Sequence, residues 1–226
     1  MDIAVDSNQE SVNAIRYFDV LIIGAGISGI DAAYHLQKNC PGKSFTLLET
    51  QETFGGTWAT HKYPGIRSDS DLFTFGFKWK PWKDAPIATA DKILRYLNEA
   101  LDENDLRQHI RFSCTVISAS WSSDEARWTL EVANGETGEI EQYGCHFLWM
   151  CQGYYRHSEG YMPDYPGREN FKGPVIHPQN WPEDLDYSGK EVVVIGSGAT
   201  AATLIPAMAG TAGHITMLQR SPTSFF

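Results

Sequence analysis

Residues 17–36 read YFDVLIIGAGISGIDAAYHL, and this stretch decides the fold. Its apolar run from Val20 to Ile23 is typical of a parallel strand that is buried on both faces. A GxGxxG motif follows, and the apolar residues after it recur at helical spacing. Gly24 permits a tight turn, Gly26 lets a pyrophosphate approach the backbone, and Gly29 lets the helix pack on the strand. The stretch therefore predicts a βαβ unit that binds a dinucleotide at the helix N-terminus.

The next strand, SFTLLET, narrows the choice of nucleotide because it ends at Glu49, about 20 residues past the motif as the fingerprint requires. A carboxylate there accepts hydrogen bonds from ribose hydroxyls and repels a 2′-phosphate, so this site should hold FAD or NAD and not NADP. The loop GGTW, residues 55–58, favours FAD, because adjacent glycines such as Gly56 let the backbone lie against a flat ligand. An ordinary turn is the alternative for this loop.

The middle of the chain is expected to begin with a loop and to continue with a helix and several strands. Residues 63–82, YPGIRSDSDLFTFGFKWKPW, predict a loop with short turns because Pro64-Gly65 breaks regular structure. Arg67 and Asp69 either both point into a flavin site or form a solvated ion pair. Asp91 is expected to be the N-cap of a helix with apolar residues at helical spacing. IRFSCTVISASW, RWTLEVAN and HFLWMCQG then predict strands of a small antiparallel meander.

A second strand–glycine–helix pattern occupies residues 190–209, KEVVVIGSGATAATLIPAMA. Gly196, Gly198 and Ala201 form GxGxxA, and the strand that follows ends in Gln219-Arg220 where the first site has an acid. Without the acid, a 2′-phosphate is not repelled, and arginine supplies a bidentate donor for it. The second site is therefore expected to prefer NADPH, with a plain surface arginine as the alternative.

Composition excludes several classes of protein. The net charge of −10, with no offsetting basic stripe, argues against nucleic acid as a partner. No apolar run reaches the roughly 18 residues of a membrane span, and the polar start lacks a signal core, so a cytoplasmic protein is expected. The four cysteines are scattered without a CxxC pair, which predicts reduced thiols and no metal site.

The expected fold is α/β, with two Rossmann-like dinucleotide-binding units built on parallel sheets and a small antiparallel β meander. The second unit is expected to be truncated at the chain end. The boundaries that we expect are a flexible tail, an FAD-binding domain, an interdomain linker and the start of an NADPH-binding domain: residues 1–16, 17–160, 161–190 and 191–226. One cofactor would then be a resident flavin, and the other a nicotinamide that reduces it.

The linker contains FKGPVIHPQNWP, residues 171–182, and here the chain resembles the Baeyer–Villiger type of flavin monooxygenases. The family fingerprint FxGxxxHxxxWP is matched through Phe171, Gly173, His177, Trp181 and Pro182. GAGISG, GGTW, YPGIRSDSD, IGSGATA and LQRSPT are also similar to family segments. The resemblance implies that NADPH reduces FAD, that O2 then forms a C4a-peroxyflavin, and that this species inserts oxygen into ketones or oxidises sulfur and nitrogen compounds.

The resemblance also assigns residues to roles. FAD is implied to contact Ser28, Glu49, Thr57, Trp58, Asp69 and the backbone around Val116. Residues 67–69 (Arg67, Ser68 and Asp69) are implied to lie near both flavin and nicotinamide, and Arg67 and Asp69 are candidate catalytic residues. NADPH is implied to contact Gly196, Ser197, Gly198, Ala199, Thr200, Ala201, Gln219 and Arg220.

His177 is interpreted as a catalytic relay or hinge residue at the junction, with a purely structural role as the alternative. Family members are much longer than this chain, and the family's active-site arginine lies in a segment absent from it. Two alternatives to a ketone-oxidising enzyme therefore stay open: a monooxygenase of sulfur and nitrogen compounds, and a non-catalytic FAD-binding fragment. A truncated edge could also promote self-association.

Overall fold

The computed structural model describes residues 14–224, so most of the expected N-terminal tail lies outside the described part. Contacts divide the chain into two compact units. The first unit comprises Met1–Phe54 and Leu106–Gln152, and the second comprises Gly55–Asp105 and Gly153–Phe226. The boundaries expected at residues 160 and 190 rest on motifs and stay a prediction.

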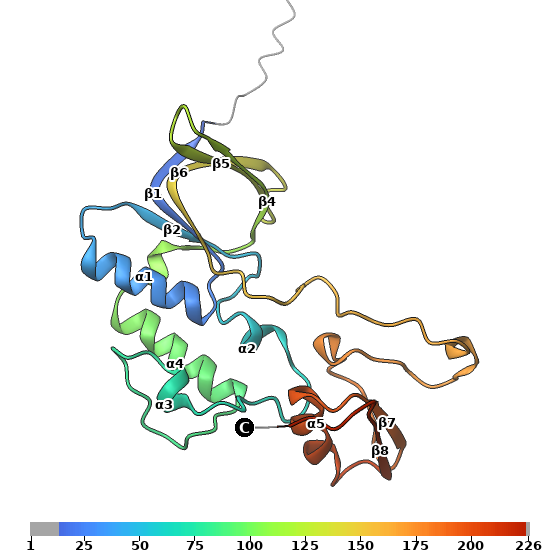
Figure 1. The fold of residues 1–226 in the computed structure, drawn as a ribbon. Helices are drawn as coiled ribbons and strands as arrows, with labels where there is room; N and C mark the ends of the chain where they lie inside the picture. The colour runs from blue at the N-terminus through green and yellow to red at the C-terminus, as the bar shows by residue number, and fades with distance from the viewer. Residues whose placement is uncertain (1–13, 225–226) are drawn as a thin grey trace, which may run out of the picture. The chain divides into compact units, whose positions relative to one another are not determined.

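The first unit is built on a six-stranded mixed sheet in the order β3-β2-β1-β6-β5-β4 (Figure 1). Strand β1 pairs in parallel with both β2 and β6, β2 pairs in parallel with β3, and β5 pairs antiparallel with β4 and β6. The predicted α/β class and antiparallel meander are confirmed. The elements are β1 Arg16–Ile23, α1 Ile27–Asn39, β2 Phe45–Leu48, η1 Arg107–His109, β3 Ile110–Arg111, β4 Cys114–Ser122, β5 Arg127–Asn134 and β6 Ile140–Met150.

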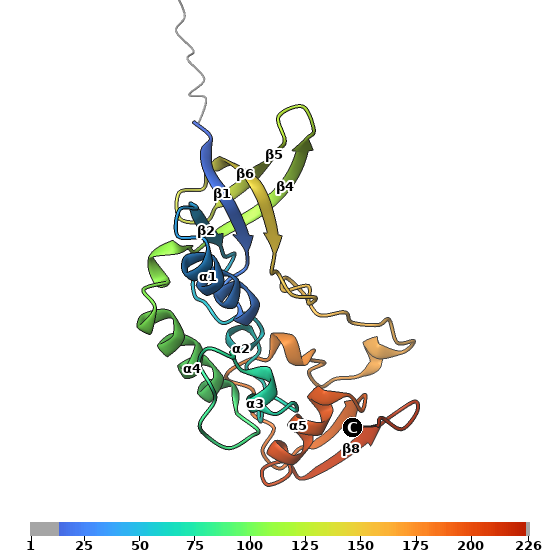
Figure 2. The same ribbon diagram turned by 60° about the vertical axis from the view of Figure 1, so that its left-hand side comes forward.

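The core of the first unit explains the uninterrupted apolar run of β1. Leu21 and Ile23 belong to a buried cluster with residues of β4, β5 and β6. The alternate positions, Val20 and Ile22, are also buried and project from the opposite face of the strand. Helix α1 contacts β1 and β2 and is drawn next to their ends in Figure 2. With both faces covered, the strand has no polar side to present, as the sequence predicts.

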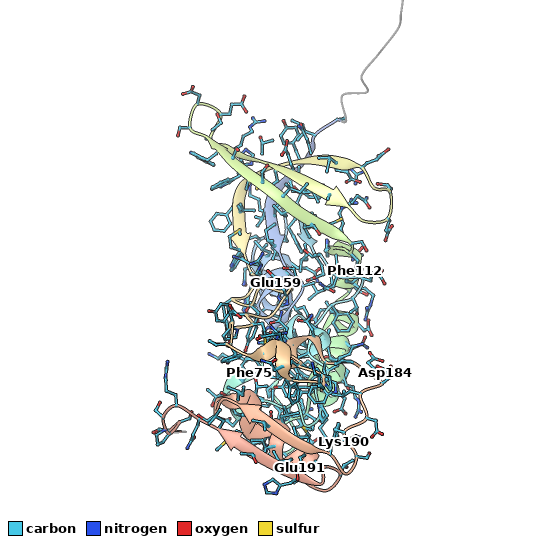
Figure 3. All side chains as sticks on the ribbon, turned by 90° about the vertical axis from the view of Figure 1, so that its right-hand side faces the viewer. Phe75, Phe112, Glu159, Asp184, Lys190 and Glu191 are labelled. Atoms are coloured by element: carbon cyan, nitrogen blue, oxygen red, sulfur yellow. The ribbon has the colours of Figure 1, made fainter. Side chains whose placement is uncertain are left out.

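The second unit contains a two-stranded parallel sheet, β7-β8, and helices of different lengths. A buried cluster of Tyr63, Leu204 and Met208 joins the loop after α2 to α5, and Val192 and Ile215 of the sheet pack against it. In Figure 3, Lys190 and Glu191 mark the start of β7. The elements are α2 Thr57–Thr60, α3 Leu72–Phe75, α4 Ala90–Glu103, η2 Arg168–Asn170, η3 Pro178–Asn180, β7 Glu191–Ile195, α5 Ala199–Met208 and β8 His214–Leu218.

Helix α4 forms where the apolar spacing predicts it, but its start differs. The expectation that Asp91 is the N-cap is wrong, because the helix begins at Ala90 and its N-cap is Thr89. The Thr89 hydroxyl donates a hydrogen bond to the Asp91 carboxylate. Asp91 thus lies in the first turn, where a negative charge interacts favourably with the helix dipole.

All four cysteines are free thiols, with Cys114 and Cys145 buried. Burial raises the pKa of the Cys145 thiol to about 11 and also raises the pKa of the Cys114 thiol. These two thiols therefore behave as apolar core residues and stay protonated at neutral pH. Between residues 14 and 224, no helix combines the length and apolar character needed to cross a bilayer.

Candidate functional site

The turn after β1 requires glycine for steric reasons. Gly24 has φ +103°, and a Cβ on it would lie 2.6 Å from the carbonyl oxygen of Cys151. Its N–H donates to the Leu48 carbonyl over 2.8 Å, and the Cys151 N–H donates to the Ile23 carbonyl over 2.9 Å. The turn is thus held at the carboxyl ends of β1, β2 and β6, where ligands bind in open parallel sheets.

The N-terminus of α1 is suited to bind phosphate. Gly26 is the N-cap and makes no side-chain capping bond, so no cap side chain covers the first N–H groups of the helix. A Cβ on Gly29 would overlap the Gly24 carbonyl oxygen, so the helix approaches the turn more closely than any larger residue permits. Ser28 is exposed in the first turn of α1. These features fit the pyrophosphate of a bound dinucleotide.

Glu49 follows β2 and reaches the same turn. Its side chain is 7% exposed, and its Oε2 accepts a hydrogen bond from the Ala25 N–H over 2.7 Å. Oε1 accepts from the Gln51 N–H over 2.9 Å. A carboxylate has about four acceptor positions, so two remain that can receive ribose hydroxyls. The arrangement fits the adenosine ribose of FAD, and two backbone bonds fix the carboxylate without any ligand.

Val116 lies in β4, two residues after the start of that strand. The N–H of Cys114, the first residue of β4, donates to the Glu49 carbonyl over 2.8 Å. Val116 is half-buried against the same apolar cluster as Leu21, and the strand pairing is irregular between Val116 and Ser118. The first unit thus brings together the glycine turn, Glu49 and the start of β4.

The GGTW loop belongs to the second unit. Gly55 and Gly56 have φ +115° and +54°, so both occupy backbone conformations that favour glycine. Thr57 and Trp58 begin α2, and the Trp58 indole is half-buried with its ring centroid 6.1 Å from that of Phe75, edge to face. The loop therefore has a fixed conformation and a partly accessible aromatic face.

The segment Arg67–Asp69 is held by its backbone. The Ser68 N–H donates to the Ala88 carbonyl over 2.9 Å, and its buried hydroxyl donates to the Ser70 carbonyl over 2.8 Å. Arg67 and Asp69 on either side of it are exposed. Among the described residues, no ion pair joins Arg67 to Asp69, so both charged groups are available to a ligand.

Tyr155 is close enough to this segment to feel the charge of Asp69. A hydrogen bond with Tyr154 and burial, followed by the charges of Tyr154, Tyr63 and Asp69, raise the pKa of Tyr155 to about 12. Tyr155 is therefore a neutral phenol at physiological pH, and it lies within the electrostatic range of Asp69. The sequence pattern gave no reason to single out Tyr155.

The second glycine turn has the same construction as the first. Gly196 has φ +121°, and its N–H donates to the Leu218 carbonyl over 2.8 Å. Gly198 is the N-cap of α5 and makes no side-chain capping bond. Ala201 is 6% exposed at the position that corresponds to Gly29. Because a Cβ on Gly196 or Gly198 would meet no atom within 4 Å, this turn is open to a ligand.

The other predicted nucleotide contacts surround this turn. The Ser197 hydroxyl lies 2.7 Å from that of Thr223. The carbonyl groups of Ala199 and Thr200 accept from the Thr203 hydroxyl over 3.2 and 3.0 Å. Gln219 and Arg220 follow β8 and are exposed. The chain thus presents an arginine after the second strand of this unit and a buried glutamate after the second strand of the other.

The fingerprint segment is packed at one end and exposed at the other. Trp181 is half-buried against the cluster of Tyr63, Leu204 and Met208, whereas Phe171 is 62% exposed. His177 caps η3, and its Nδ1 accepts a hydrogen bond from the Gln179 N–H over 3.2 Å. The HxxxW half of the motif is therefore structured by the second unit itself.

His61 is a buried residue that the sequence reading missed. It is 8% exposed, and its Nδ1 lies 3.1 Å from the Thr57 carbonyl oxygen, which requires the ring to donate from Nδ1. The pKa of His61 is lowered, chiefly because the ring is buried. The hydrogen bond to Thr57 raises the pKa in part, and the charges of His157 and His177 lower it further. An isolated histidine carries no spacing signal, so only the fold reveals this group of three.

Comparison with known proteins agrees with this geometry. The family model "Flavin-binding monooxygenase-like" matches residues 81–225, and "NAD(P)-binding Rossmann-like domain" matches residues 22–84. The chain is 56% identical over 210 residues to the FAD-containing monooxygenase EthA of Mycolicibacterium smegmatis, covering 92% of this chain and 42% of that protein. It is 51% identical over 216 residues to the putative FAD-containing monooxygenase MymA of Mycobacterium tuberculosis, covering 93% and 44%.

A solved structure extends the comparison to the fold. Cyclohexanone monooxygenase from Rhodococcus sp. Phi1, bound to NADP+, superposes with a TM-score of 0.77 at 32% identity, covering 93% of this chain and 39% of that one. The chain spans about two fifths of the length of the curated relatives it matches. The family model covers more than half of the chain and includes the fingerprint and the second glycine turn. The chain belongs to the flavin-binding monooxygenase-like family.

Proposed function

We propose that the protein is an FAD- and NADPH-dependent monooxygenase that inserts oxygen into ketones and also oxidises sulfur compounds. The observation that carries this proposal is the pair of glycine turns with different residues after the second strand: Glu49 in one unit, and Gln219 with Arg220 in the other. The likeness to a structure named cyclohexanone monooxygenase supports a ketone as substrate. FAD is the cofactor in the names of the EthA and MymA relatives, and NADP+ is bound in that structure.

The assignment of cofactors to residues follows from charge. In this proposal Glu49 accepts hydrogen bonds from the ribose of FAD, while Arg220 donates to the 2′-phosphate of NADPH. FAD binding is assigned to residues 17–160 and NADPH binding to residues 191–226, with residues 161–190 as the connection. Bound FAD, once reduced by NADPH, supplies the activation of O2, and the chain supplies binding, orientation and electrostatics.

Arg67 and Asp69 are proposed to act near the reacting ring systems. Both side chains are exposed beside a backbone segment that Ser68 fixes, and neither is neutralised by the other. An arginine in such a place offers a permanent positive charge that favours developing negative charge, and an aspartate can accept a proton or orient an amide. In this proposal Thr57 and Trp58 contact the flavin, and Ser28 contacts its pyrophosphate.

His177 is proposed to act at the connection as a relay or hinge residue. Support comes from its fixed Nδ1 acceptor, which leaves Nε2 as the only nitrogen that can carry the proton of the neutral ring. The alternative is a purely structural residue, because Trp181 alone already packs the segment on the second unit.

The test begins with the visible spectrum of the purified chain after reconstitution with FAD. NADPH added without oxygen should bleach the flavin, and air should restore it. A panel of ketones under 18O2 should then give esters or lactones that carry one labelled atom, detected by mass spectrometry.

Each other outcome selects a different function. Sulfoxides from thioethers, without an ester from any ketone, would reject the ketone proposal and favour oxidation of sulfur and nitrogen compounds. A yellow preparation that neither oxidises NADPH nor forms product would identify a non-catalytic FAD-binding fragment. A colourless chain that cannot be reconstituted would contradict FAD binding itself.

A further inference from the structure

His177 is held in one tautomer by its own turn. Its Nδ1 accepts a hydrogen bond from the Gln179 N–H over 3.2 Å, and a backbone N–H can only donate. Nδ1 must therefore carry a lone pair, so the proton of the neutral ring lies on Nε2. In the described part of the chain, no hydrogen bond occupies that Nε2.

The turn that carries His177 is tied to residues 156–160, which Glu159 marks in Figure 3. The Gln179 side chain is 7% exposed, and its amide nitrogen donates to the Arg156 carbonyl over 2.5 Å. The Asn180 side-chain oxygen accepts from the Gly160 N–H over 3.3 Å. Two side chains of η3 therefore bond to a segment about twenty residues earlier, and the buried amide of Gln179 would be costly to leave unpaired.

Gly160 completes the arrangement by having no side chain. A Cβ built on it would overlap the His177 ring at Nδ1, Cγ and Cε1. Its φ is not among the positive values that favour glycine, so the backbone itself would accept alanine. The imidazole, and not the backbone conformation, is the reason for a glycine here.

We propose that Gly160 and Gln179 are positioning residues that hold the His177 imidazole in one place and one tautomer, with Nε2–H free to donate. Gly160 provides the surface on which the ring lies, and Gln179 anchors the N–H that fixes Nδ1. The consequence for turnover rests on the proposed function of His177, whereas the consequence for the ring itself does not.

The first test reads the ring directly. In the FAD-loaded chain labelled with 15N-histidine, with His177→Ala used for assignment, the two nitrogen shifts of His177 should report a single Nε2–H tautomer. Gly160→Ala and Gln179→Met should each shift those signals toward a mixture of tautomers. Gly210→Ala is the matched control, because a Cβ there meets nothing within 4 Å. His177 signals unchanged in both variants would overturn the proposal.

A double-mutant cycle gives a second, independent readout. Gly160→Ala should lower the urea midpoint in the unaltered chain, because the new methyl displaces the ring. In a His177→Ala background the ring is absent, so Gly160→Ala should have no further effect. An equal loss in both backgrounds would overturn the proposal, since the glycine would then serve something other than the ring.

The rate of oxygenated product formation separates this proposal from the proposed function. Misplacing a participating group by about 1 Å costs up to about 100-fold in rate, so Gly160→Ala should slow product formation by about 10- to 100-fold while NADPH oxidation continues. If the tautomer changes and turnover does not, the positioning of His177 is supported and its proposed role as relay or hinge is rejected.

Discussion

At the scale of one residue, Glu49 is a carboxylate that the fold itself fixes and that is proposed to bind the ribose of FAD. Both of its oxygens accept backbone N–H groups, from Ala25 and Gln51, in a buried setting. A glutamine in its place has only one acceptor oxygen, so one N–H would face an amide NH2 group. The structural and ligand-binding contributions of this residue can therefore be measured separately.

Glu49→Gln should lower the free energy of unfolding by about 1–3 kcal/mol, because one buried backbone donor loses its acceptor. It should also lower the affinity for FAD by about 10- to 100-fold, because charge-assisted hydrogen bonds to the ribose are lost. Urea unfolding and titration of the apoprotein with FAD measure the two effects. Glu52→Gln, at an exposed position of the same loop, is the control and should change neither. Undiminished FAD affinity in Glu49→Gln would contradict the assignment.

Arg220 is the residue on which the proposed preference for NADPH rests. Arg220→Ala should lower the affinity for NADP+ by about 10- to 100-fold and leave the affinity for NAD+ nearly unchanged, because only NADP+ carries the 2′-phosphate. Calorimetric titration with both nucleotides measures the difference. Arg168→Ala removes another exposed arginine of the same unit and serves as the control. An equal loss of affinity for both nucleotides would show that Arg220 does not bind the 2′-phosphate.

Helix α1 and the turn before it form one element whose geometry depends on Gly29. Gly29→Ala should abolish FAD binding and lower the urea midpoint markedly, because the added Cβ overlaps a backbone oxygen that cannot move without opening the turn. Gly42→Ala is the matched control, since a Cβ there meets nothing within 4 Å and its backbone is not in the positive-φ region. Normal FAD binding by Gly29→Ala would show that the turn relaxes.

The elements differ in how well the sequence predicts them, and the reason is the range of the interactions that form them. Strand β1, helix α1 and the corresponding β7 and α5 follow local patterns of apolar residues and glycine, so the sequence finds them. Thr89 and Asp91 are both of residue types that favour the N-cap position, so the sequence alone does not decide at which of them α4 starts. The single strand predicted over IRFSCTVISASW is divided in the structure into β3, which pairs with β2, and β4, which pairs with β5. The break falls at Ser113, whose φ of +55° leaves the extended conformation, and the apolar pattern does not reveal it.

The same distinction applies to the candidate site. Glu49 and Arg220 are found from sequence because their spacing from a glycine motif is fixed by the length of one βαβ unit. His61, Tyr155 and Gln179 are not, because each acquires its setting from segments far away along the chain. The sequence therefore predicts the geometry of the two glycine turns better than it predicts which groups surround the connection.

At the scale of the whole molecule, the chain passes between its two compact units three times, after Phe54, Asp105 and Gln152. Each passage contains a residue with left-handed backbone: Gly55 at φ +115°, Asp105 at φ +53° and Gly153 at φ +72°. Such conformations cost about 1–2 kcal/mol for residues other than glycine. Glycine at two of the three passages therefore avoids this cost.

Gly153 offers a clean measurement of this cost, because a Cβ there would meet nothing within 4 Å. Gly153→Ala should lower the free energy of unfolding by about 1–2 kcal/mol through backbone strain alone. Gly153→Asn should lose less, since asparagine tolerates left-handed backbone. Urea unfolding of both variants decides the matter. Equal losses for alanine and asparagine would indicate a contact of the side chain instead of strain.

His61 is expected to make the stability of the second unit depend on pH. Its neighbours are Tyr63 and, from a distant stretch of the chain, Tyr155, His157 and His177. Its folded-state pKa is lowered, chiefly by burial, so the unfolded chain binds the proton more readily. The stabilisation from the neutral ring is complete above the unfolded pKa of about 6.5 and is lost as pH falls below that value toward the lowered folded pKa.

His61→Phe should therefore make stability less sensitive to pH. Urea midpoints compared at pH 7.5 and pH 5.5 should fall less in this variant than in the unaltered chain, because phenylalanine keeps a buried ring but cannot be protonated. The absolute midpoint at pH 7.5 should be lower, since the hydrogen bond to the Thr57 carbonyl is lost. His214→Phe, at an exposed position in β8, is the control and should retain the full pH dependence. If His61→Phe lost as much stability on acidification as the unaltered chain, another group would be responsible, and His61 would be excluded as the residue through which protons destabilise the second unit.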